Sequence, residues 1–329
     1  MDRWFGKWRL AALLLALPGS IAWAERLYVN DKKAPENRHD LEAIQKALIE
    51  VLPKARAATV CIDLGEGAGS GVIVSADGLI LTAAHVTSGT GKELTVVMED
   101  GRRLKAASLG LVASCDCAMI KITEKGPWPF VEVDRDNSLR VGDWVFALGH
   151  SGGFDKDRGS VVRIGRLVRM ADTTVQSDCT LIGGDSGGPL FDLTGKLIGI
   201  HSRVGQRMEE NMHVPTREFV KNWDALLKGE FVGEGPFAKK PEKGRGFLGF
   251  ASQDRPGGGL DVTRVGRETA AEAAGIKSGD ILHKVDGVEI KSKEQFQKLL
   301  EDKAPGDKLK LELERAGKPL NLEVKLGER

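Results

Sequence analysis

The feature that most constrains the fold is a long stretch of sequence without helical periodicity. Between Ala57 and Ile200, short apolar or alternating segments are separated by Gly, Asp and Asn residues; examples are ATVCIDL, GVIVSADGLILTAAHV, LTVVMED and WVFALG. Such segments are typical of strands that bury one or both faces. The pattern therefore predicts a mainly β domain, built as an antiparallel barrel or sandwich.

The first 24 residues have a different character. Arg3, Lys7 and Arg9 precede an apolar run, LAALLLAL, and Ala22-Trp23-Ala24 gives a small-x-small pattern before Glu25. This order is typical of a secretory signal peptide. An uncleaved anchor is the less favoured alternative, because the apolar run is shorter than the ~20 residues that a membrane span needs. The sequence predicts export to the periplasm or the medium, with cleavage near Ala24.

Charge and composition exclude some functions. Without the three basic and one acidic residues of this signal, 45 of 48 basic and 46 of 47 acidic residues remain. A chain so close to neutrality has no basic surplus for binding nucleic acid. The spacing of its four cysteines does not fit the usual zinc knuckle. We therefore predict no metal, no cofactor and no nucleic-acid partner.

The cysteines leave two possibilities open. Cys61, Cys115, Cys117 and Cys179 all follow the signal, and export would permit disulfides. On a strand, Cys115 and Cys117 would share one face and Asp116 would point the other way. That arrangement predicts that any disulfide runs from this strand to Cys61 or Cys179. Four buried free thiols are the alternative.

The regions around the β domain differ in pattern. Residues 25–56 form an N-terminal segment in which Asp40 is expected to cap a helix that ends at Pro53, with Leu41, Ile44, Leu48 and Leu52 at helical spacing. Residues 57–228 form the β domain, which closes with a helix at TREFVKNWDALLKG. Residues 229–245 are rich in Gly, Pro and Lys and are interpreted as a linker.

Residues 246–329 form a separate, small α+β unit. Ser292 with Gln295, and Thr269 with Glu272, have the capping-box spacing that starts a helix. The segments KLKLELER and LNLEVKL alternate strictly and are joined by AGKP, which predicts a β-hairpin.

One serine is surrounded by glycines in TLIGGDSGGPL. Glycine adopts backbone angles closed to other residues, so four glycines near Ser186 suggest a loop whose amides approach an oxyanion. A serine nucleophile also needs a base and an orienting carboxylate. His85, at the end of the strand-like LILTAAHV, and Asp116, before another apolar run, supply both types of group.

A second interpretation of this serine is disfavoured. The pattern G-x-S-x-G, which marks the nucleophile elbow of α/β-hydrolases, occurs around both Ser151 and Ser186. That elbow needs a helix after the serine. Here PLFDLTGKLIGIHS follows Ser186, and its pattern predicts strand, turn and strand.

Several segments together resemble a known family. GSGVIVSADGLILTAAHV, CDCAMIKI, VGDWVFALGHSGGF, VQSDCTLIGGDSGGPLFDLTGKLIGIHS and MHVPTREFV are similar to successive blocks of HtrA/Deg serine proteases. RGFLGF and AAEAAGIKSGDILHKVDGVEIKSKEQF resemble the PDZ domain that follows in that family. The resemblance implies a trypsin-like double β-barrel followed by a small α+β PDZ domain. It also implies an exported serine endopeptidase for misfolded or regulatory proteins.

The resemblance assigns roles residue by residue. His85 would be the general base, Asp116 its orienter and Ser186 the nucleophile, with the amides of Gly184 and Ser186 as the oxyanion hole. The substrate pocket would have Thr180 as its floor and Leu181, Ile182, Ile200, His201 and Ser202 as walls. The PDZ domain would hold peptide C-termini at Phe247, Leu248, Gly249, Phe250 and Phe296. The family's usual homotrimer is built by the segment before the barrel, which here contains Tyr28.

The chain departs from the family pattern beside the serine. Asp185 stands where family members usually carry asparagine, and a carboxylate there needs a cation. Arg163, Arg166 and Arg203 are the candidates. The family's Asn-Pro pair is replaced by Ile182-Gly183, which predicts a looser loop. A proteolytically silent PDZ adaptor or holdase is the alternative function.

Overall fold

The computed structural model describes residues 26–329 except 66, 137–138, 208–209, 241 and 329. The predicted signal peptide, residues 1–24, therefore lies outside the described residues. No helix in the described part of the chain is both long enough and apolar enough to cross a membrane.

The N-terminal segment contains a short 3-10 helix, η1 (Tyr28–Asp31), and a long helix, α1 (Arg38–Ala58). The prediction that Asp40 caps this helix is wrong: Asn37 is the cap, and its side chain accepts a hydrogen bond from the Asp40 amide. Pro53 also lies inside α1 instead of ending it. The helix continues because its last turns pack on the barrel core, which offsets the hydrogen bond that proline cannot donate.

The first barrel is a closed antiparallel sheet in the order β5-β4-β1-β2-β3-β6. Its strands are β1 (Thr59–Asp63), β2 (Ala68–Ile73), β3 (Leu79–Ala83), β4 (Glu93–Val97), β5 (Arg103–Val112) and β6 (Cys117–Ile122). Pairing of β5 with β6 closes it. A one-turn helix, α2 (Ala84–Thr87), follows β3.

The second barrel is closed in the order β10-β11-β12-β9-β8-β7. Its strands are β7 (Trp144–Gly149), β8 (Val161–Ala171), β9 (Thr174–Ser177), β10 (Pro189–Asp192), β11 (Leu197–Val204) and β12 (Asn211–Pro215). Two short helices follow, α3 (Thr216–Lys221) and α4 (Trp223–Leu227). The predicted mainly β architecture is confirmed as a double barrel, and the strand β10 after Ser186 excludes the hydrolase elbow.

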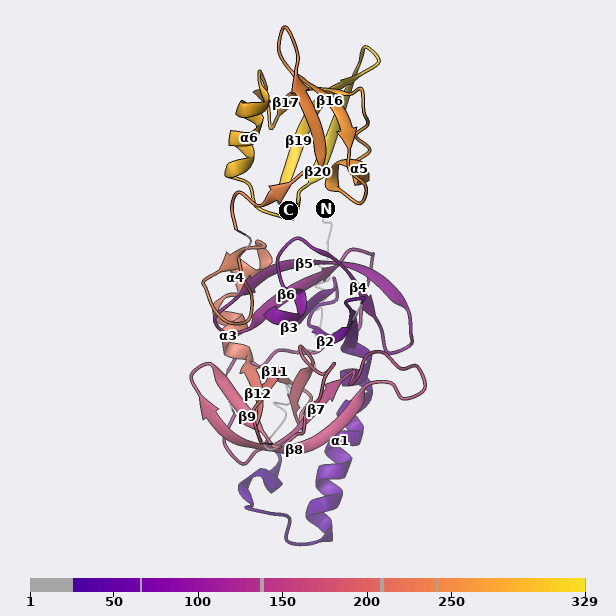
Figure 1. Cartoon of the computed structure of the whole chain (residues 1–329). Helices are drawn as coiled ribbons and strands as arrows, with labels where there is room; N and C mark the ends of the chain where they lie inside the picture. The colour runs from indigo at the N-terminus through magenta and orange to yellow at the C-terminus, as the bar shows by residue number, and fades with distance from the viewer. Residues whose placement is uncertain (1–25, 66, 137–138, 208–209, 241, 329) are drawn as a thin grey trace, which may run out of the picture.

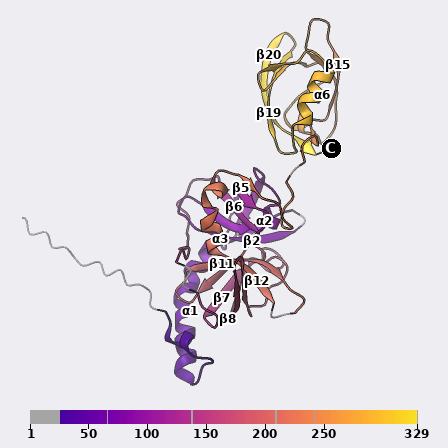
Figure 2. The ribbon, with the colours of Figure 1, turned by 90° about the vertical axis from the view of Figure 1, so that its left-hand side faces the viewer.

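The predicted linker begins with a strand. β13 (Phe231–Val232) pairs in parallel with β5 and extends the sheet of the first barrel. Phe231 and Phe237 pack against a small buried cluster that includes Leu111. Burial of these aromatic side chains explains why a Gly-rich and Lys-rich segment stays on the barrel. The chain after this point leads to the C-terminal domain (Figure 2).

The C-terminal domain has its own core and a sheet in the order β15-β16-β17-β19-β20. Its elements are β14 (Gly246–Phe247), β15 (Phe250–Asp254), β16 (Leu260–Val265), α5 (Ala270–Ala273), β17 (Ile281–Val285), β18 (Val288–Glu289), α6 (Lys293–Glu301), β19 (Lys308–Arg315), β20 (Lys318–Lys325) and β21 (Gly327–Glu328). Both predicted helix caps, Ser292 and Thr269, are confirmed, as is the β19–β20 hairpin. Figure 1 shows the first barrel between this domain and the second barrel.

Candidate active site

His85 and Asp116 lie in contact in the first barrel. His85 is in α2, and Asp116 lies in the turn before β6. His85 Nδ1 is 2.9 Å from Asp116 Oδ2, and the His85 amide donates to Asp116 Oδ1 at 3.1 Å. The carboxylate is fully buried, whereas the His85 side chain is 36% exposed. Asp116 therefore holds the Nδ1 side of the His85 ring, while part of the side chain stays open to solvent.

Ser202 belongs to the same group. Its Oγ donates to Asp116 Oδ2 at 2.6 Å. The sequence resemblance placed Ser202 in a pocket wall, and this contact with Asp116 was not predicted. No sequence signal joins the two residues, because they lie 86 positions apart, Ser202 on β11 of the second barrel and Asp116 in the turn before β6 of the first.

The loop of Ser186 is tied to the first barrel. Ser70, on β2, donates its amide to the Ser186 carbonyl at 2.7 Å and its Oγ to the Gly184 carbonyl at 2.8 Å. Ser186 and His85 are both partly exposed. No hydrogen bond joins their side chains among the described residues, and in sites without substrate such bonds are often long. The Ser70 bridge brings the loop to the barrel that carries His85 and Asp116.

Backbone amides beside Ser186 are free to bind an anion. The Gly183 carbonyl accepts a hydrogen bond from the Gly152 amide at 2.7 Å, and the next amide of a trans peptide points the opposite way. Within the described residues, neither Gly184 N nor Ser186 N donates to a protein acceptor. Gly184 has φ +94, and a Cβ there would lie 2.5 Å from the His150 carbonyl. Two free amides next to a serine match the donor pair of an oxyanion hole.

The buried carboxylate of Asp185 has a cation partner. Arg163, on β8, places a guanidinium nitrogen 3.0 Å from Asp185 Oδ2. Ser151 donates to Asp185 Oδ1 at 2.6 Å and accepts from Arg163 at 2.7 Å, which gives the second G-x-S-x-G serine a structural role. The Ile182 amide also donates to Asp185, at 2.9 Å. The carboxylate thus ties the loop at Ile182, just before the two free amides, to Ser151 and Arg163.

The other two candidate cations point elsewhere. Arg166 lies over the Trp144 ring at 4.5 Å and donates to the carbonyls of Lys32 and Lys33. Arg203 lies over the Phe237 ring at 5.3 Å. Arg163 is therefore the partner that the sequence could not select.

The six predicted pocket residues occupy different environments. Thr180 and Ile182 are exposed, Ile182 by 57%. Leu181 and Ile200 are buried in two separate hydrophobic clusters. The pocket remains a prediction, and Thr180 and Ile182 are the members of the set that solvent reaches.

His201, the remaining pocket candidate, belongs to a buried histidine pair. Its Nδ1 lies 2.9 Å from Nδ1 of His213, and its Nε2 lies 3.1 Å from the Leu148 carbonyl. His213 Nε2 contacts the Ser177 hydroxyl at 2.8 Å. Burial, together with the charge of Arg163, lowers the pKa of His201 to about 3, and burial holds the pKa of His213 well below its usual value. Both rings are neutral at pH 7.

This pair predicts acid sensitivity. The unfolded chain protonates both histidines below about pH 6.5, whereas the folded chain does not, so the unfolded state binds more protons. The free energy of unfolding should fall as the pH drops below 6.5, by up to about 1.4 kcal/mol per pH unit for each histidine. Urea unfolding between pH 6.5 and 5 measures this slope. His213→Gln should flatten it, and substitution of the exposed His39 should not; an unchanged slope in His213→Gln would contradict the prediction.

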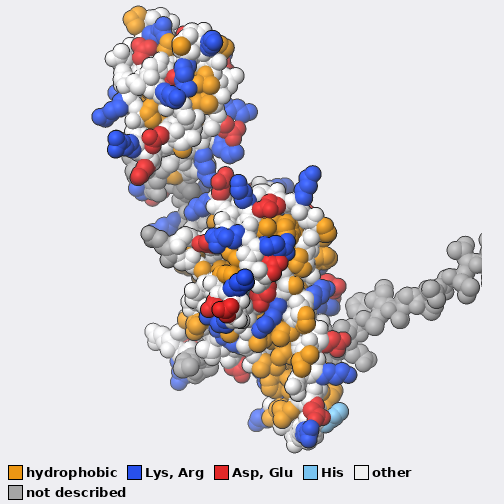
Figure 3. Space-filling model, turned by 90° about the vertical axis from the view of Figure 1, so that its right-hand side faces the viewer, with side chains coloured by type: hydrophobic (Ala, Val, Ile, Leu, Met, Phe, Trp, Pro, Cys, Tyr) orange, Lys and Arg blue, Asp and Glu red, His pale blue; other side chains and the backbone are white. Residues whose placement is uncertain are grey.

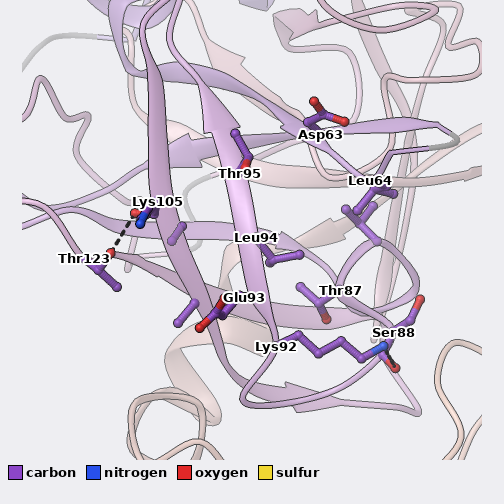
Figure 4. Close-up of a pocket in the computed structure, with 13 residues that line it drawn as sticks. Asp63, Leu64, Thr87, Ser88, Lys92, Glu93, Leu94, Thr95, Lys105 and Thr123 are labelled. Carbon is purple, nitrogen blue, oxygen red and sulfur yellow. Dashed lines mark hydrogen bonds between the residues drawn. The ribbon is translucent and has the colours of Figure 1, made fainter. Parts of the chain in front are cut away.

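A separate cavity lies on the rim of the first barrel (Figure 4). Its lining comes from the end of β1, from α2 and the loop after it, and from β4 and β5, and includes Asp63, Thr87, Ser88, Lys92 and Lys105. Burial lowers the pKa of Lys92, whose ammonium donates to the Ser88 carbonyl at 3.0 Å. None of His85, Asp116 and Ser186 lines this cavity, so it is distinct from the candidate active site.

All four cysteines are buried free thiols, the alternative that the sequence left open. The expected strand geometry around Asp116 is wrong. β6 begins only at Cys117, and Asp116 has φ 63, a left-handed conformation that breaks the alternation of a strand. Cys115 Sγ and Cys117 Sγ consequently lie 3.2 Å apart.

Comparison with known proteins agrees with this fold. Residues 69–200 match the family model of a trypsin-like peptidase domain, and residues 246–326 match a PDZ domain. A probable periplasmic serine endoprotease, DegP-like, of Bartonella henselae is 31% identical over 266 residues, which cover 78% of this chain and 52% of that protein. The corresponding protein of Halomonas elongata is 31% identical over 269 residues, covering 79% and 56%.

Among solved structures, the HtrA-type protease AlgW with a tripeptide aligns with a TM-score of 0.50 and 24% identity, covering 87% of this chain and 97% of that one. This similarity supports the fold. The fold and the site define a trypsin-like serine peptidase domain followed by a PDZ domain. Over both domains the chain is similar to DegP-like serine endoproteases, and it spans about half the length of the curated relatives it matches.

Proposed function

We propose that the chain is a serine endopeptidase that hydrolyses peptide bonds in misfolded or regulatory proteins. The observation that carries this proposal is the arrangement around Ser70. Ser70 ties the glycine loop of Ser186 to the barrel in which Asp116 holds the His85 ring at 2.9 Å. Nucleophile, base and orienting carboxylate therefore meet at the junction of the two barrels.

Each group has a role in this chemistry. Ser186 Oγ attacks the scissile carbonyl, while His85 Nε2 takes the proton and later delivers it to the leaving amine. Asp116 stabilises the imidazolium, and Ser202 donates at 2.6 Å to Oδ2, the carboxylate oxygen that lies 2.9 Å from His85 Nδ1. The free amides of Gly184 and Ser186 donate to the oxyanion, a contribution of roughly 3 to 4 kcal/mol per donor.

Digestion of unfolded casein by the chain lacking residues 1–24 tests the function, with Ser186→Ala as the control. Because Thr180 carries no charge, a basic side chain entering the predicted pocket would lose hydration without gaining a carboxylate partner. Sequencing of the products should therefore find cuts mainly after Val, Ala, Ile and Leu. Cuts mainly after Arg or Lys would reject the pocket. No difference between the parent and Ser186→Ala would favour the silent adaptor.

The C-terminal domain is proposed to bind peptide C-termini. β15 is an edge strand, and Phe250 at its start stacks on Phe296 of α6 with ring centroids 5.5 Å apart. A peptide can add as a strand to such an edge. Leu248 N and Gly249 N donate to no protein acceptor within the described residues, so both can bind a terminal carboxylate. Leu248 itself is buried in the core, and Phe247 is 36% exposed.

This mode predicts a preference for free C-termini. Hydrogen bonds to a charged group contribute about 1.5–3 kcal/mol, so amidation of the peptide terminus should weaken binding roughly 10-fold to 100-fold. Fluorescence anisotropy with a labelled apolar peptide and its amidated twin measures the ratio. Equal affinities would argue against carboxylate capture by this loop.

The periplasm is the proposed location. The Bartonella henselae and Halomonas elongata relatives carry the word periplasmic in their names. The predicted signal peptide, with cleavage near Ala24, gives the same destination. Expression with the native leader, followed by N-terminal sequencing of the exported chain, tests the cleavage site.

A homotrimer assembled through the N-terminal segment is also proposed. Tyr28 is 42% exposed, its ring stacks on His39, and its hydroxyl donates to Asp40 at 2.8 Å. Leu41 and Ile49 of α1 are 57% and 60% exposed. On the side of the molecule where α1 lies, hydrophobic side chains gather over the lower part of the surface (Figure 3). Light scattering of chains beginning at residues 25 and 41 tests this assembly: a monomer in both cases rejects the trimer.

A further inference from the structure

Two thiols flank the carboxylate that orients the proposed base. The Sγ atoms of Cys115 and Cys117 lie 3.2 Å apart, and the residue between them is Asp116. Cys115 is 8% exposed and Cys117 is fully buried. The left-handed conformation of Asp116, at φ 63, turns both thiols toward each other.

We propose that Cys115 and Cys117 are a thiol modification site: they form a reversible disulfide that moves Asp116 and switches the peptidase off. The effect on activity rests on the proposed function. The bond itself does not.

Closing this bond requires movement at Cys115. A disulfide has an S–S distance of about 2.03–2.05 Å, so the sulfurs must approach by roughly 1.2 Å. Cys117 is the first residue of β6, and it pairs with Ala83 of β3 on one side and with Val112 of β5 on the other. Cys115 lies outside the sheet, in the turn. The turn is therefore the part that shifts, and Asp116 lies in this turn, next to Cys115.

Asp116 has little freedom to absorb that shift. Its carboxylate is held by the amide and ring of His85 and by Ser202, and its carbonyl accepts from the Ala84 amide at 3.1 Å. A displacement of the turn must lengthen some of these contacts. A misplacement of about 1 Å at a catalytic group can cost 10²-fold in rate. Strain at a left-handed, non-glycine residue is also a common feature of functional sites.

The reaction is a two-electron thiol–disulfide exchange with a disulfide oxidant. The thiolate of Cys115 attacks one sulfur of the oxidant and expels the other as a thiolate, which gives a mixed disulfide. Deprotonated Cys117 then attacks Cys115 Sγ and expels the second thiolate, so the oxidant leaves as two thiols and takes up the two protons. A dithiol reductant reverses both steps.

The environments of the two thiols fit this order. The hydrogen bond from Cys117 lowers the pKa of Cys115, which lies next to the exposed Ser114. Burial raises the pKa of Cys117 well above its usual value. Cys115 is thus the thiol that is both more accessible and more readily ionised, and Cys117 is the resolving thiol.

The other two cysteines are internal controls. Burial raises the pKa of Cys61 to about 11 and that of Cys179 to about 12. Within the described residues, neither has another sulfur at hydrogen-bonding distance. They should stay reduced under conditions that oxidise Cys115 and Cys117.

The experiment treats the full exported chain with glutathione disulfide and then with dithiothreitol. Peptide mapping without reduction locates the bond, and casein digestion measures activity. We expect a peptide that has lost two hydrogens and links Cys115 to Cys117, together with an approximately 10²-fold fall in kcat/KM that dithiothreitol restores. Cys115→Ala and Cys117→Ala should each keep the activity of the reduced parent and become insensitive to glutathione disulfide. The double variant Cys61→Ala/Cys179→Ala should respond like the parent.

Two results would overturn the proposal. One is a map that shows free thiols, or only a glutathione adduct, at Cys115 and Cys117. The other is a mapped Cys115–Cys117 bond with unchanged kcat/KM. Failure of the proposed function gives a different result, since the reduced chain would not cleave casein at all. In that case the map still decides whether the bond forms, and a fluorophosphonate probe of Ser186 reports whether it changes the site.

Discussion

Ser186→Ala and His85→Ala are each expected to lower kcat for an unfolded substrate by about 10⁶-fold, and Asp116→Ala by about 10⁴-fold. These magnitudes follow from serine peptidases in which nucleophile and base act as a unit, while the carboxylate contributes through the base. Here the same dependence is expected because Asp116 contacts Nδ1 of His85 at 2.9 Å, behind the ring face that meets substrate. Initial rates on a fluorogenic peptide or labelled casein measure the loss.

The double variant Ser186→Ala/His85→Ala makes the prediction sharper. If the two residues act in one step, the double variant should lose scarcely more activity than either single variant. Circular dichroism and thermal unfolding control for folding, and both should match the parent, because Ser186 and His85 are partly exposed. Losses that multiply in the double variant would mean that the two side chains act independently, which this mechanism does not allow.

The sequence pointed to the residues of the candidate site but not to the contacts that hold them in place. Ser186 in its glycine loop, His85 at a strand end and Asp116 before an apolar run were recognisable because their residue types and order are themselves the signal. Strand alternation gave the β architecture in the same way, because a period of two is a local property of the sequence. Helix caps such as Ser292 are also local, and they were predicted correctly.

The errors have a common physical cause. The strand pattern through CDCAMIKI suggested that Asp116 points away from two cysteines on one face, but the left-handed backbone at Asp116 is imposed by its contacts with His85 and Ser202. Likewise, Pro53 continues a helix because that helix packs on the barrel, and Phe231 joins β13 to the first sheet. Contacts between distant segments decided each case, and such contacts leave no periodic trace in the sequence.

The cation that pairs with Asp185 could likewise not be identified from the sequence alone. Three arginines fitted the charge requirement, and only the fold distinguishes Arg163 from Arg166 and Arg203. In trypsin-like enzymes that are activated by cleavage, the new N-terminal ammonium group pairs with a buried carboxylate beside the serine. Here Arg163 has that role, because its guanidinium neutralises Asp185 next to Ser186. The ion pair is built into β8, so the loop that carries Gly184 and Ser186 is braced without a processing step.

Arg163→Met is therefore expected to lower both stability and activity. The substitution leaves the fully buried Asp185 carboxylate without its cation, a change that typically costs 3–5 kcal/mol. The carboxylate also holds the Ile182 amide, so its displacement should disturb the Gly184 amide and lower kcat by about 10²-fold to 10³-fold. Urea unfolding and casein kinetics measure the two effects. Arg169→Met, at an exposed position of the same strand, is the matched control and should change neither.

The double variant Arg163→Met/Asp185→Asn separates charge from packing. Asparagine is neutral. Its oxygen, in the place of Oδ2, can accept from the Ile182 amide, and its NH2 group, in the place of Oδ1, can donate to the Ser151 hydroxyl. Once the carboxylate is gone, the missing guanidinium leaves no buried charge, so the double variant should recover most of the stability and activity that Arg163→Met loses. Asp185→Asn alone should be intermediate, because Arg163, with 17% side-chain exposure, can reach water. If the double variant is as impaired as the sum of the two single variants, then Arg163 acts through packing, and the loop is not braced by charge.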